Sequence, residues 1–573
     1  MISFVLYIPS YFIITGRLLP GNAKNTMTRR FLYVVLTVWL CLSAGMPLCA
    51  APRIVNFVNF IRQNDYRVKG SEALLFEATE RELELLRQYN LPGTFLLQYD
   101  ALIDVRYQKL LTERLDSRSE VGAWWEITQP HVEAAGLKWR GDHPWVSTAN
   151  VGFATGYTQE ERRRLVDVYM AKFKEVFGDY PKSVGSWYID AYTLQYMYDN
   201  YHIVASCNCR DQLGTDGYTL WGGYWNQAYY PSKKNGYMPA QTEEGQVPVP
   251  VFRMLGSDPI YQYDSGLGDN GQGVVTLEPV YGASGADRHW VECYFDAVAN
   301  QPCLAFNYTQ AGQENSFTWP EIRKGLEMQV PYIADLYRAG KITVQTLKES
   351  GTWFARQFRV TPPTAITAVK DNTGNGKQTV WFNSRHYRAN ILMEKDGELR
   401  FRDIHLFDET MPSDYIDRPG QTSHFSFFTP PLVDGFQWSD KNTLAGLRFV
   451  ELDGQGRAQN IRFSKMQVLE KGKRRLVVKL TDMQGTVFTV GFTEKGISVT
   501  SAMKTSWALE LTTAAVDLPF TQVGQQRMEA VFLNHPYHVS LRKATFVQPM
   551  AGQQFVFRIQ PQGGTLYMDC SNS

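Results

Sequence analysis

The chain has 573 residues, of which 44% are hydrophobic and 20% are charged, and its net charge at pH 7 is +1. These values are those of a folded soluble protein with about two or three domains. The near-zero net charge argues against nucleic acid or an anionic membrane surface as the partner. The 14 Trp, 31 Tyr and 32 Phe residues form a large aromatic set, and such side chains stack on sugar rings as well as filling cores.

The N-terminal segment has the layout of a secretory signal peptide. Met27-Thr-Arg-Arg supplies a short basic region, Phe31–Gly45 is apolar, and the small residues Ala50 and Ala51 follow. We therefore predict a signal peptide over residues 27–51 and an exported protein that is periplasmic or secreted. The alternative is an uncleaved membrane anchor, although the apolar stretch is short for a membrane span. After removal of the signal, no integral membrane segment is expected.

The next 300 residues alternate between short apolar runs and helical patterns. The expected strands cover residues 54–61, 93–100, 120–127, 183–190, 203–208 and 301–309. The expected helices cover residues 77–90, 106–115, 158–178, 193–201 and 320–340. The third helix has a Thr at its start and a Gly at its end, both of which are typical caps. This alternation predicts an α/β fold in which a parallel sheet closes, or nearly closes, into a (β/α) barrel of seven or eight strands over residues 53–360.

The character of the sequence changes after Pro362-Pro363. Helical periodicity is scarce, and strand-like runs cover residues 379–382, 399–406, 476–481, 486–492 and 555–559. Turns such as NTGNG and LDGQG separate them. This pattern predicts a C-terminal all-β, sandwich-like domain over residues 365–573.

Polar and aromatic residues gather where the predicted barrel strands end, which is where barrels of this type carry their sites. We assign binding or catalytic roles to Arg62, Asp65, Trp124, Trp125, Glu126, Asp190, Asp216, Trp221, Tyr224, Trp225, Asn226 and Asp258. Carboxylates and amides hydrogen-bond hydroxyl groups, and aromatic faces cover the apolar face of a sugar ring. The expected partner is therefore a neutral oligo- or polysaccharide.

Three segments resemble motifs of a known superfamily of barrels. LPGTFLLQYDAL (residues 91–102) resembles the TFFL strand of NodB-type polysaccharide deacetylases and of glycoside hydrolase families 38 and 57. SEVGAWWEITQPHV (residues 119–132) is similar to the EIGxHTxxHP strand of the deacetylases. SWYIDAYTLQYM (residues 186–197) is similar to the WxIDPFGHS strand of family 38. The whole chain also resembles uncharacterised exported bacterial proteins with an N-terminal barrel and a C-terminal β-domain.

The sequence differs from these motifs at the positions where the related families bind a metal ion. The deacetylases hold a divalent metal with one Asp and two His, and the two His positions are Trp124 and Thr128 here. Without those ligands a metal-bound water cannot be held by this motif. Gln63 likewise stands where family 38 has a ligand His. No cofactor is therefore expected, and a divalent metal is kept as an open alternative.

The carboxylates of the motifs are present. In family 38 the Asp of WxID is the nucleophile, so the resemblance implies that role for Asp190. A glycosidase needs a second carboxyl group, and the candidates, in order of preference, are Asp65, Glu126, Asp216 and Asp258. The alternatives for the three predicted catalytic residues are a helix cap for Asp190, a salt bridge to Arg62 or Arg67 for Asp65, and a rim position for Glu126.

The aromatic run WGGYWNQAYY (residues 221–230) is predicted to contact the substrate, with packing in the core as its alternative. Together these features predict an exported glycoside hydrolase that uses paired carboxylates. A metal-dependent polysaccharide deacetylase and a non-catalytic carbohydrate-binding protein are the two alternatives, since one fold hosts many functions.

Overall fold

The computed structural model describes residues 51–215, 217–269, 271–550 and 552–572. The predicted signal peptide lies outside the described residues except for Ala51. From Pro52 onward the chain forms one compact unit. None of the helices in the described ranges has the length and apolarity that a membrane crossing needs.

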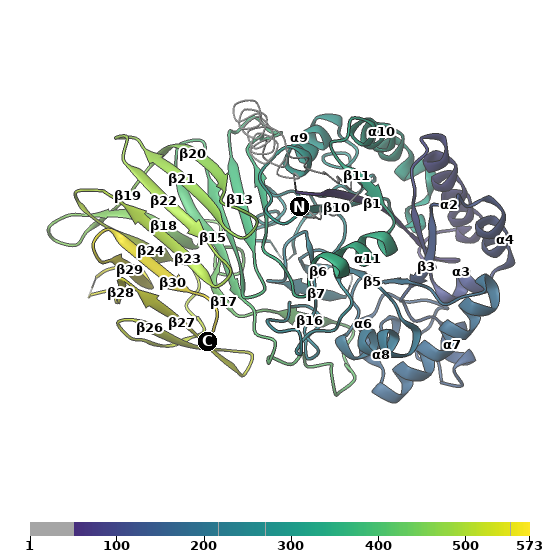
Figure 1. Ribbon diagram of the computed structural model, residues 1–573. Helices are drawn as coiled ribbons and strands as arrows, with labels where there is room; N and C mark the ends of the chain where they lie inside the picture. The colour runs from purple at the N-terminus through teal and green to yellow at the C-terminus, as the bar shows by residue number, and fades with distance from the viewer. Residues whose placement is uncertain (1–50, 216, 270, 551, 573) are drawn as a thin grey trace, which may run out of the picture. The chain divides into compact units, whose positions relative to one another are not determined.

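The first half of this unit is a nearly closed barrel with helices around it (Figure 1). Its strands follow one another in the order β10-β1-β2-β3-β4-β5-β9-β8. Neighbours are parallel except β8, which runs antiparallel to β9, while β11 adds to β1. Their bounds are β1 Arg53–Ile61, β2 Thr94–Leu97, β3 Glu120–Trp124, β4 Ser183–Gly185, β5 Ala205–Asn208, β8 Ala228–Tyr229, β9 Val251–Arg253, β10 Asn307–Ala311 and β11 Thr343–Gln345. The predicted barrel of seven or eight strands is confirmed.

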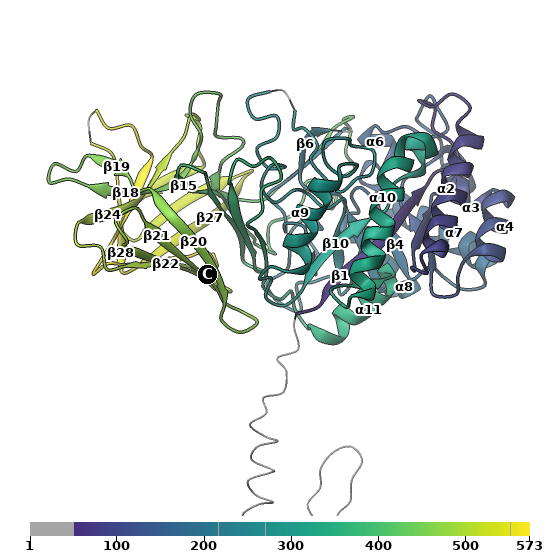
Figure 2. The same cartoon turned by 90° about the horizontal axis from the view of Figure 1, so that it is seen from above.

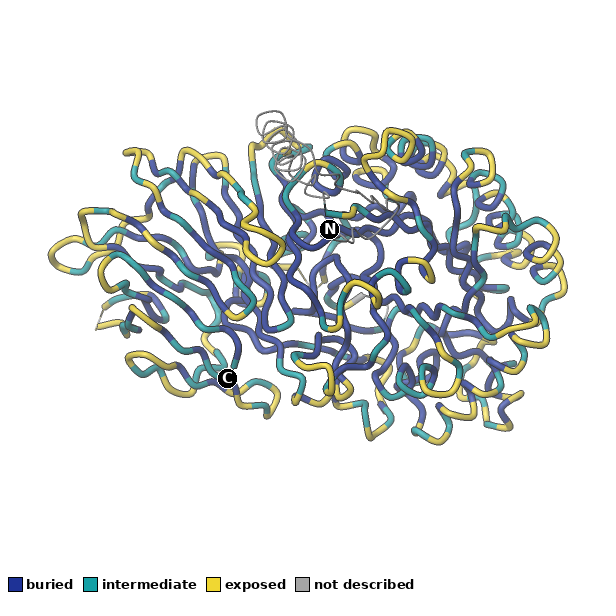
Figure 3. The backbone as a smooth tube through the Cα atoms, viewed as in Figure 1, coloured by how far each residue is buried: buried dark blue, intermediate teal, exposed yellow. Residues whose placement is uncertain are grey.

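Continuous apolar runs form these strands because helices cover the outer face and packed side chains fill the inner one. In β1, the run RIVNFVNFI is buried at every position after Arg53. Figure 3 shows buried backbone along the barrel strands and exposed backbone mainly in the outer loops and helices. The strands therefore place their last residues in an interior that is shielded from bulk water.

The helices alternate with the strands along the chain, and α2, α7 and α10 lie on the outside of the barrel (Figure 2). In α7, Thr158 forms a capping box with Glu161, and Gly178 ends the helix at φ 84°, as its sequence predicted. The α-helices are α2 Ser71–Gln88, α3 Tyr99–Ile103, α4 Val105–Arg114, α5 Gln129–Ala134, α6 Ala149–Gly152, α7 Gln159–Phe177, α8 Ala191–Tyr201, α9 Arg288–Ala299, α10 Thr318–Arg338 and α11 Leu347–Gln357. Two 3-10 turns are η1 Ala154–Gly156 and η2 Asn315–Phe317.

The second half is a sandwich of two antiparallel sheets that share one apolar core, as predicted. The first sheet contains β12 Thr364–Ala368, β13 Gln378–Asn383, β14 Tyr387–Met393, β15 Leu399–Leu406, β17 Pro431–Asp434, β18 Gly446–Leu452, β19 Ala458–Asn460, β24 Ser506–Thr512, β28 Ala544–Val547 and β29 Phe557–Pro561. The second contains β20 Phe463–Glu470, β21 Leu476–Asp482, β22 Val487–Phe492, β23 Gly496–Ser501, β25 Phe520–Val523, β26 Arg527–Phe532, β27 His535–Arg542 and β30 Thr565–Asp569.

A small third sheet joins the two halves. The hairpin β6 (Gln212–Thr215) and β7 (Tyr218–Trp221) leaves the barrel after β5. Strand β16 (Phe425–Phe428), from the C-terminal half, pairs in parallel with β7. Close by, Tyr188 of the barrel stacks on Phe427 with 3.7 Å between ring centroids. The C-terminal half therefore supplies part of the wall beside the carboxyl ends of the barrel strands.

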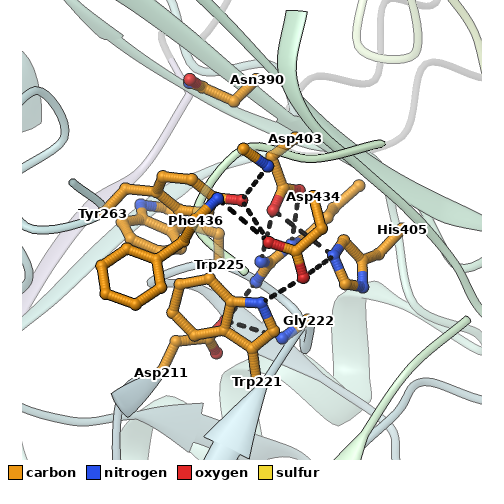
Figure 4. A network of polar contacts seen from close by, with 12 residues as sticks. Asp211, Trp221, Gly222, Trp225, Tyr263, Asn390, Asp403, His405, Asp434 and Phe436 are labelled. Carbon is orange, nitrogen blue, oxygen red and sulfur yellow. Dashed lines mark hydrogen bonds and ion pairs between the residues drawn. The ribbon is translucent and has the colours of Figure 1, made fainter. Parts of the chain in front are cut away.

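A buried ionic network continues this junction (Figure 4). Arg388 of β14 pairs with Asp211 of the barrel and, at 2.8 Å, with Asp403 of β15. The indole nitrogen of Trp221 donates to Asp434 at 2.8 Å. Gly222 has φ 90° and donates its backbone N–H to Asp211, and a Cβ there would lie 2.1 Å from Thr429 Oγ1. Only glycine fits this close approach of the two halves.

Arg388→Gln tests whether this network holds the halves together. The substitution leaves Asp211 and Asp403 buried without a shared cation, and breaking a buried ion pair costs about 3–5 kcal/mol. We expect the free energy of unfolding in urea, followed by Trp fluorescence, to fall by about that amount.

The matched control is Arg542→Gln, which removes a pair with Asp569 in which the Arg side chain is 71% exposed. An exposed pair contributes less than about 1 kcal/mol. If both variants lose the same free energy of unfolding, burial of the network adds nothing to the stability of the protein.

Candidate functional site

A cavity of about 380 Å³ opens at the carboxyl ends of the barrel strands. Residues that follow β1, β3, β5 and β10 line it, which is the face where barrels of this kind bind ligands. The lining contains four carboxylates, three arginines and several aromatic rings: Asp65, Glu126, Glu278, Glu314, Arg62, Arg67, Arg210, Trp145, Phe153, Trp187, Tyr218, Tyr281 and Phe317. Of the residues predicted from sequence, Arg62, Asp65 and Glu126 meet here.

Arg62 is the centre of this cluster. Its guanidinium forms a bidentate pair with Glu126, at 2.9 and 2.7 Å. The same guanidinium donates to Glu314 at 2.6 Å and lies 3.7 Å from Asp65. Three carboxylates from the ends of β1, β3 and β10 are therefore gathered around one cation. The planar guanidinium suits this task because it offers five donors in a fixed geometry.

Glu126 is fully occupied by hydrogen-bond donors. Besides Arg62, Gln98 Nε2 donates to it at 2.8 Å and the indole nitrogen of Trp187 donates at 2.8 Å. Glu126 is 1% exposed, so it lies at the floor of the cavity and not at its rim. Its four donors fix the orientation of Arg62 and of the Trp187 ring.

Asp65 is held as an ionised carboxylate. Arg67 donates to it from Nε at 2.9 Å, from Nη2 at 2.6 Å and from its backbone nitrogen at 3.0 Å. Burial alone would raise the pKa of Asp65, but the hydrogen bonds from Arg67 and the charges of Arg62 and Arg67 lower it overall. Asp65 thus forms the salt bridge to Arg67 that the sequence offered as an alternative, and it also lines the cavity.

Glu278 has a different environment within the same cavity. It accepts a hydrogen bond from Thr276 Oγ1 at 2.7 Å and one from Gln313 Nε2 at 3.3 Å. Both of these donors are neutral, whereas Glu126, Glu314 and Asp65 all receive hydrogen bonds from arginines. The four carboxylates of the cavity therefore do not all share the same kind of hydrogen-bond donor.

Aromatic rings line the remaining walls. Trp145 covers Arg62, with the guanidinium carbon 4.1 Å from the ring centroid, and it also covers Arg67 at 5.0 Å. Trp187 lies edge-on to Trp124, with 5.4 Å between ring centroids. Rings next to carboxylates are what a sugar-binding cleft requires, because the faces stack and the oxygens accept hydroxyl hydrogen bonds.

The deacetylase metal site has no counterpart among the described residues. No group of three or more His, Cys, Asp or Glu side chains there is arranged to hold a metal ion. Trp124 is buried in the core, and Thr128 donates its hydroxyl to Asp100. His131 contacts the carbonyl of Leu165 at 2.8 Å, and burial lowers its pKa to about 4. These side chains do not fit a divalent metal.

Asp190, the predicted nucleophile, lies outside the cavity lining. β4 ends at Gly185, so the apolar run continues past the sheet and Asp190 is not a strand end. Its carboxylate caps α8 by accepting from the backbone N–H of Thr193 at 2.9 Å. It also pairs with the buried Arg162 at 3.0 Å. This is the helix-cap alternative, and the predicted catalytic role finds no support in the position of Asp190.

The remaining predicted binding residues also lie away from the cavity. Trp124 and Trp125 fill the barrel core, and Trp221, Tyr224 and Trp225 are buried against the C-terminal half, where Trp225 stacks on Trp381 at 3.7 Å. Asn226 donates to the carbonyl of Ser257, and Asp258 accepts from backbone nitrogens and from Trp290. The aromatic side chains of residues 221–230 are thus packed in the interior, which is the alternative that the sequence offered for them. Asp216 lies outside the described residues.

Several lining residues were not among those given a role from the sequence. Glu278 and Trp145 come from long loops, where no periodic pattern marks a site. Glu314 and Arg210 follow β10 and β5, so the strand-end rule that selected Arg62 applied to them as well. Trp187 belongs to the same motif as Asp190, and it is the Trp, not the Asp, that reaches the cavity.

Comparisons with known proteins agree with this architecture. No family model and no curated protein matches the sequence. A solved protein named as a glycoside hydrolase/deacetylase, from Parabacteroides distasonis, aligns at a TM-score of 0.51 and 15% identity, over 68% of this chain and 92% of its own. The barrel therefore shares its fold with that solved protein. This confirms, at the level of fold, the resemblance seen in the motifs.

Two further solved structures align at lower scores. One, named as a polysaccharide deacetylase from Pseudomonas aeruginosa, has a TM-score of 0.33 and 11% identity, over 54% of this chain and 93% of its own. The other, a 4-alpha-glucanotransferase from Thermococcus litoralis, has a TM-score of 0.21 and 11% identity, over 90% of this chain and 97% of its own.

Asp190→Asn distinguishes a structural role from a catalytic one. The variant keeps a side chain that can cap a helix but leaves Arg162 buried without its carboxylate. We expect the free energy of unfolding to fall by about 3–5 kcal/mol.

A double-mutant cycle with Arg162→Met supplies the control. Because the two residues contact each other, their effects should be coupled by about 0.5–3 kcal/mol, and the double variant should recover part of the loss. Unchanged stability together with lost activity would restore the catalytic role predicted from the sequence.

Proposed function

We propose that this protein is an exported glycoside hydrolase that cleaves oligo- or polysaccharides with paired carboxylates. The proposal rests chiefly on one observation: a cavity at the carboxyl ends of the barrel strands lined by four carboxylates and several aromatic rings. The solved protein of the same fold, which is named as a glycoside hydrolase/deacetylase, supports a carbohydrate-processing role. A glycosidase needs two carboxyl groups with opposite protonation, one as acid and one as base or nucleophile.

Asp65 fits the role of the ionised carboxylate. Hydrogen bonds from Arg67 and the charges of Arg62 and Arg67 lower its pKa despite its burial, which favours the ionised carboxylate. A charged carboxylate can act on a developing oxocarbenium ion as nucleophile, or can activate water as a base.

Glu278 fits the role of the general acid. Its hydrogen bonds from the Thr276 hydroxyl and the Gln313 amide, which are neutral donors, orient the carboxyl group at the cavity wall. A proton on Glu278 would then be available to the leaving oxygen of the glycosidic bond. Glu126 and Glu314, which are bound by Arg62, would position that guanidinium and the cavity floor.

The deacetylase alternative is not favoured by the described side chains, because none of them form a metal-ligand group. The binding-protein alternative shares the aromatic and carboxylate lining with the leading proposal. Activity measurements separate the three functions, because a glycoside hydrolase releases new reducing ends, a deacetylase releases acetate and a binding protein releases neither.

Glu278→Gln and Asp65→Asn should each lower the rate of glycan hydrolysis by about 10²–10⁴-fold, the usual contribution of a general acid or base. The measurement is the release of new reducing ends from a panel of glycans by purified protein, with and without EDTA. We expect wild-type activity to be insensitive to EDTA. Glu113→Gln, on the exposed face of α4, is the control that should retain full activity.

Three outcomes contradict the proposal. Release of acetate without new reducing ends would indicate a deacetylase, and loss of activity in EDTA would indicate a metal. Binding of glycans without any product would indicate a carbohydrate-binding protein.

A further inference from the structure

The cavity contains three arginines, and two of them are neutralised by carboxylates. Arg62 pairs with Glu126 and Glu314, and Arg67 pairs with Asp65. Arg210, which follows β5, differs from both. Its Nη1 donates to the backbone carbonyl of Asp211 at 2.7 Å, and its Nε is buried without a hydrogen-bond partner. Arg210 is 2% exposed, and it lines the cavity.

This arrangement is exceptional within the described part of the chain. Every other buried arginine there has a carboxylate within 4.0 Å: the set comprises Arg62, Arg162, Arg253, Arg388, Arg400, Arg402 and Arg558. Glu278 also lines the cavity, but no ion pair within that distance joins it to Arg210. Arg210 is therefore the one buried guanidinium in the described ranges without an ion pair.

A buried cation without a counter-ion is costly, because the protein interior does not replace its hydration. A negatively charged ligand can supply the missing charge, and the planar guanidinium suits the geometry of paired anionic oxygens such as those of a carboxylate. The cavity gives such a ligand direct access to the side chain.

We infer that Arg210 is the anion-binding residue of the substrate site and that the glycan carries a negatively charged sugar. This inference rests on the proposed function for the identity of the ligand as a glycan. It replaces the neutral polysaccharide expected from the sequence by an acidic one. The two sources of the charge are the carboxylate of a uronic acid and a sulfate ester, which share the same recognition chemistry.

Direct binding tests the inference without requiring catalysis. The probes are glucuronate, galacturonate, glucose 6-sulfate and neutral glucose, each titrated into the full-length protein. The fluorescence of Trp145 and Trp187, which line the cavity, reports occupancy. Acetate and inorganic sulfate show whether the anion alone is enough for binding.

We expect at least one acidic sugar to bind at least about tenfold more tightly than glucose, since hydrogen bonds to charged groups are the stronger ones. Arg210→Gln should abolish that preference, whereas Arg210→Lys should keep part of it. Arg106→Gln, at an exposed ion pair with Asp104, should leave it unchanged. Preference for the uronic acids or for the sulfate identifies the charged group.

The outcomes that overturn the inference are clear. They are equal binding of glucose and the acidic sugars, no binding of any acidic sugar, or an unchanged preference in Arg210→Gln. A protein that prefers acidic sugars but cleaves no glycan would disprove the hydrolase proposal and leave the anion site standing. Hydrolysis of neutral glycans only would support the hydrolase proposal and disprove the anion site.

Stability supplies an independent measurement. Because Arg210 has no carboxylate partner, Arg210→Gln should leave the thermal unfolding midpoint unchanged or raise it, as substitutions at binding sites often do. Arg253→Gln, in the neighbouring strand, removes a paired arginine and should lower the midpoint. A large loss in Arg210→Gln would mean that Arg210 has a structural role instead.

Discussion

The arrangement of the cavity depends on one guanidinium. Arg62 stands one residue beyond β1, and it draws Glu126 from the end of β3 and Glu314 from beyond β10 towards itself. Without this cation, the carboxylates of Glu126 and Glu314 would repel each other strongly in a site shielded from water. The buried cation makes the cluster of carboxylates possible, and Gln98 and Trp187 then fix Glu126 from the other side.

The sequence predicted this cluster where strand ends were well marked. The apolar run of β1 is long and ends sharply at Arg62, and β3 ends just before Glu126, so the strand-end rule found both. The same rule failed at Asp190, because an apolar run of the same appearance leaves the sheet after Gly185 and serves the packing of a loop and a helix cap. Local hydrophobicity cannot distinguish these two uses of a buried run.

The aromatic run at residues 221–230 illustrates a second limit of sequence reasoning. Aromatic residues around two glycines look like an open binding loop, but here Trp225 stacks on Trp381, about 150 residues further along the chain. Gly222 is required because Thr429 and His405 approach it closely. Both partners belong to the C-terminal half, so the packing role is set by contacts that no local pattern records. Arg210 was overlooked for a related reason, since its lack of an ion pair is a property of the folded structure alone.

The pairing of β7 with β16 has a consequence for how the protein is made. Tyr218, which lines the cavity, is joined in register to Phe425, so two segments about 200 residues apart must meet before this wall exists. Contacts of such long sequence separation form late and slow the folding of a chain. The barrel is thus synthesised long before its site can be completed, and a chain cut at the domain boundary would display the apolar faces of Trp221 and Trp225 to solvent.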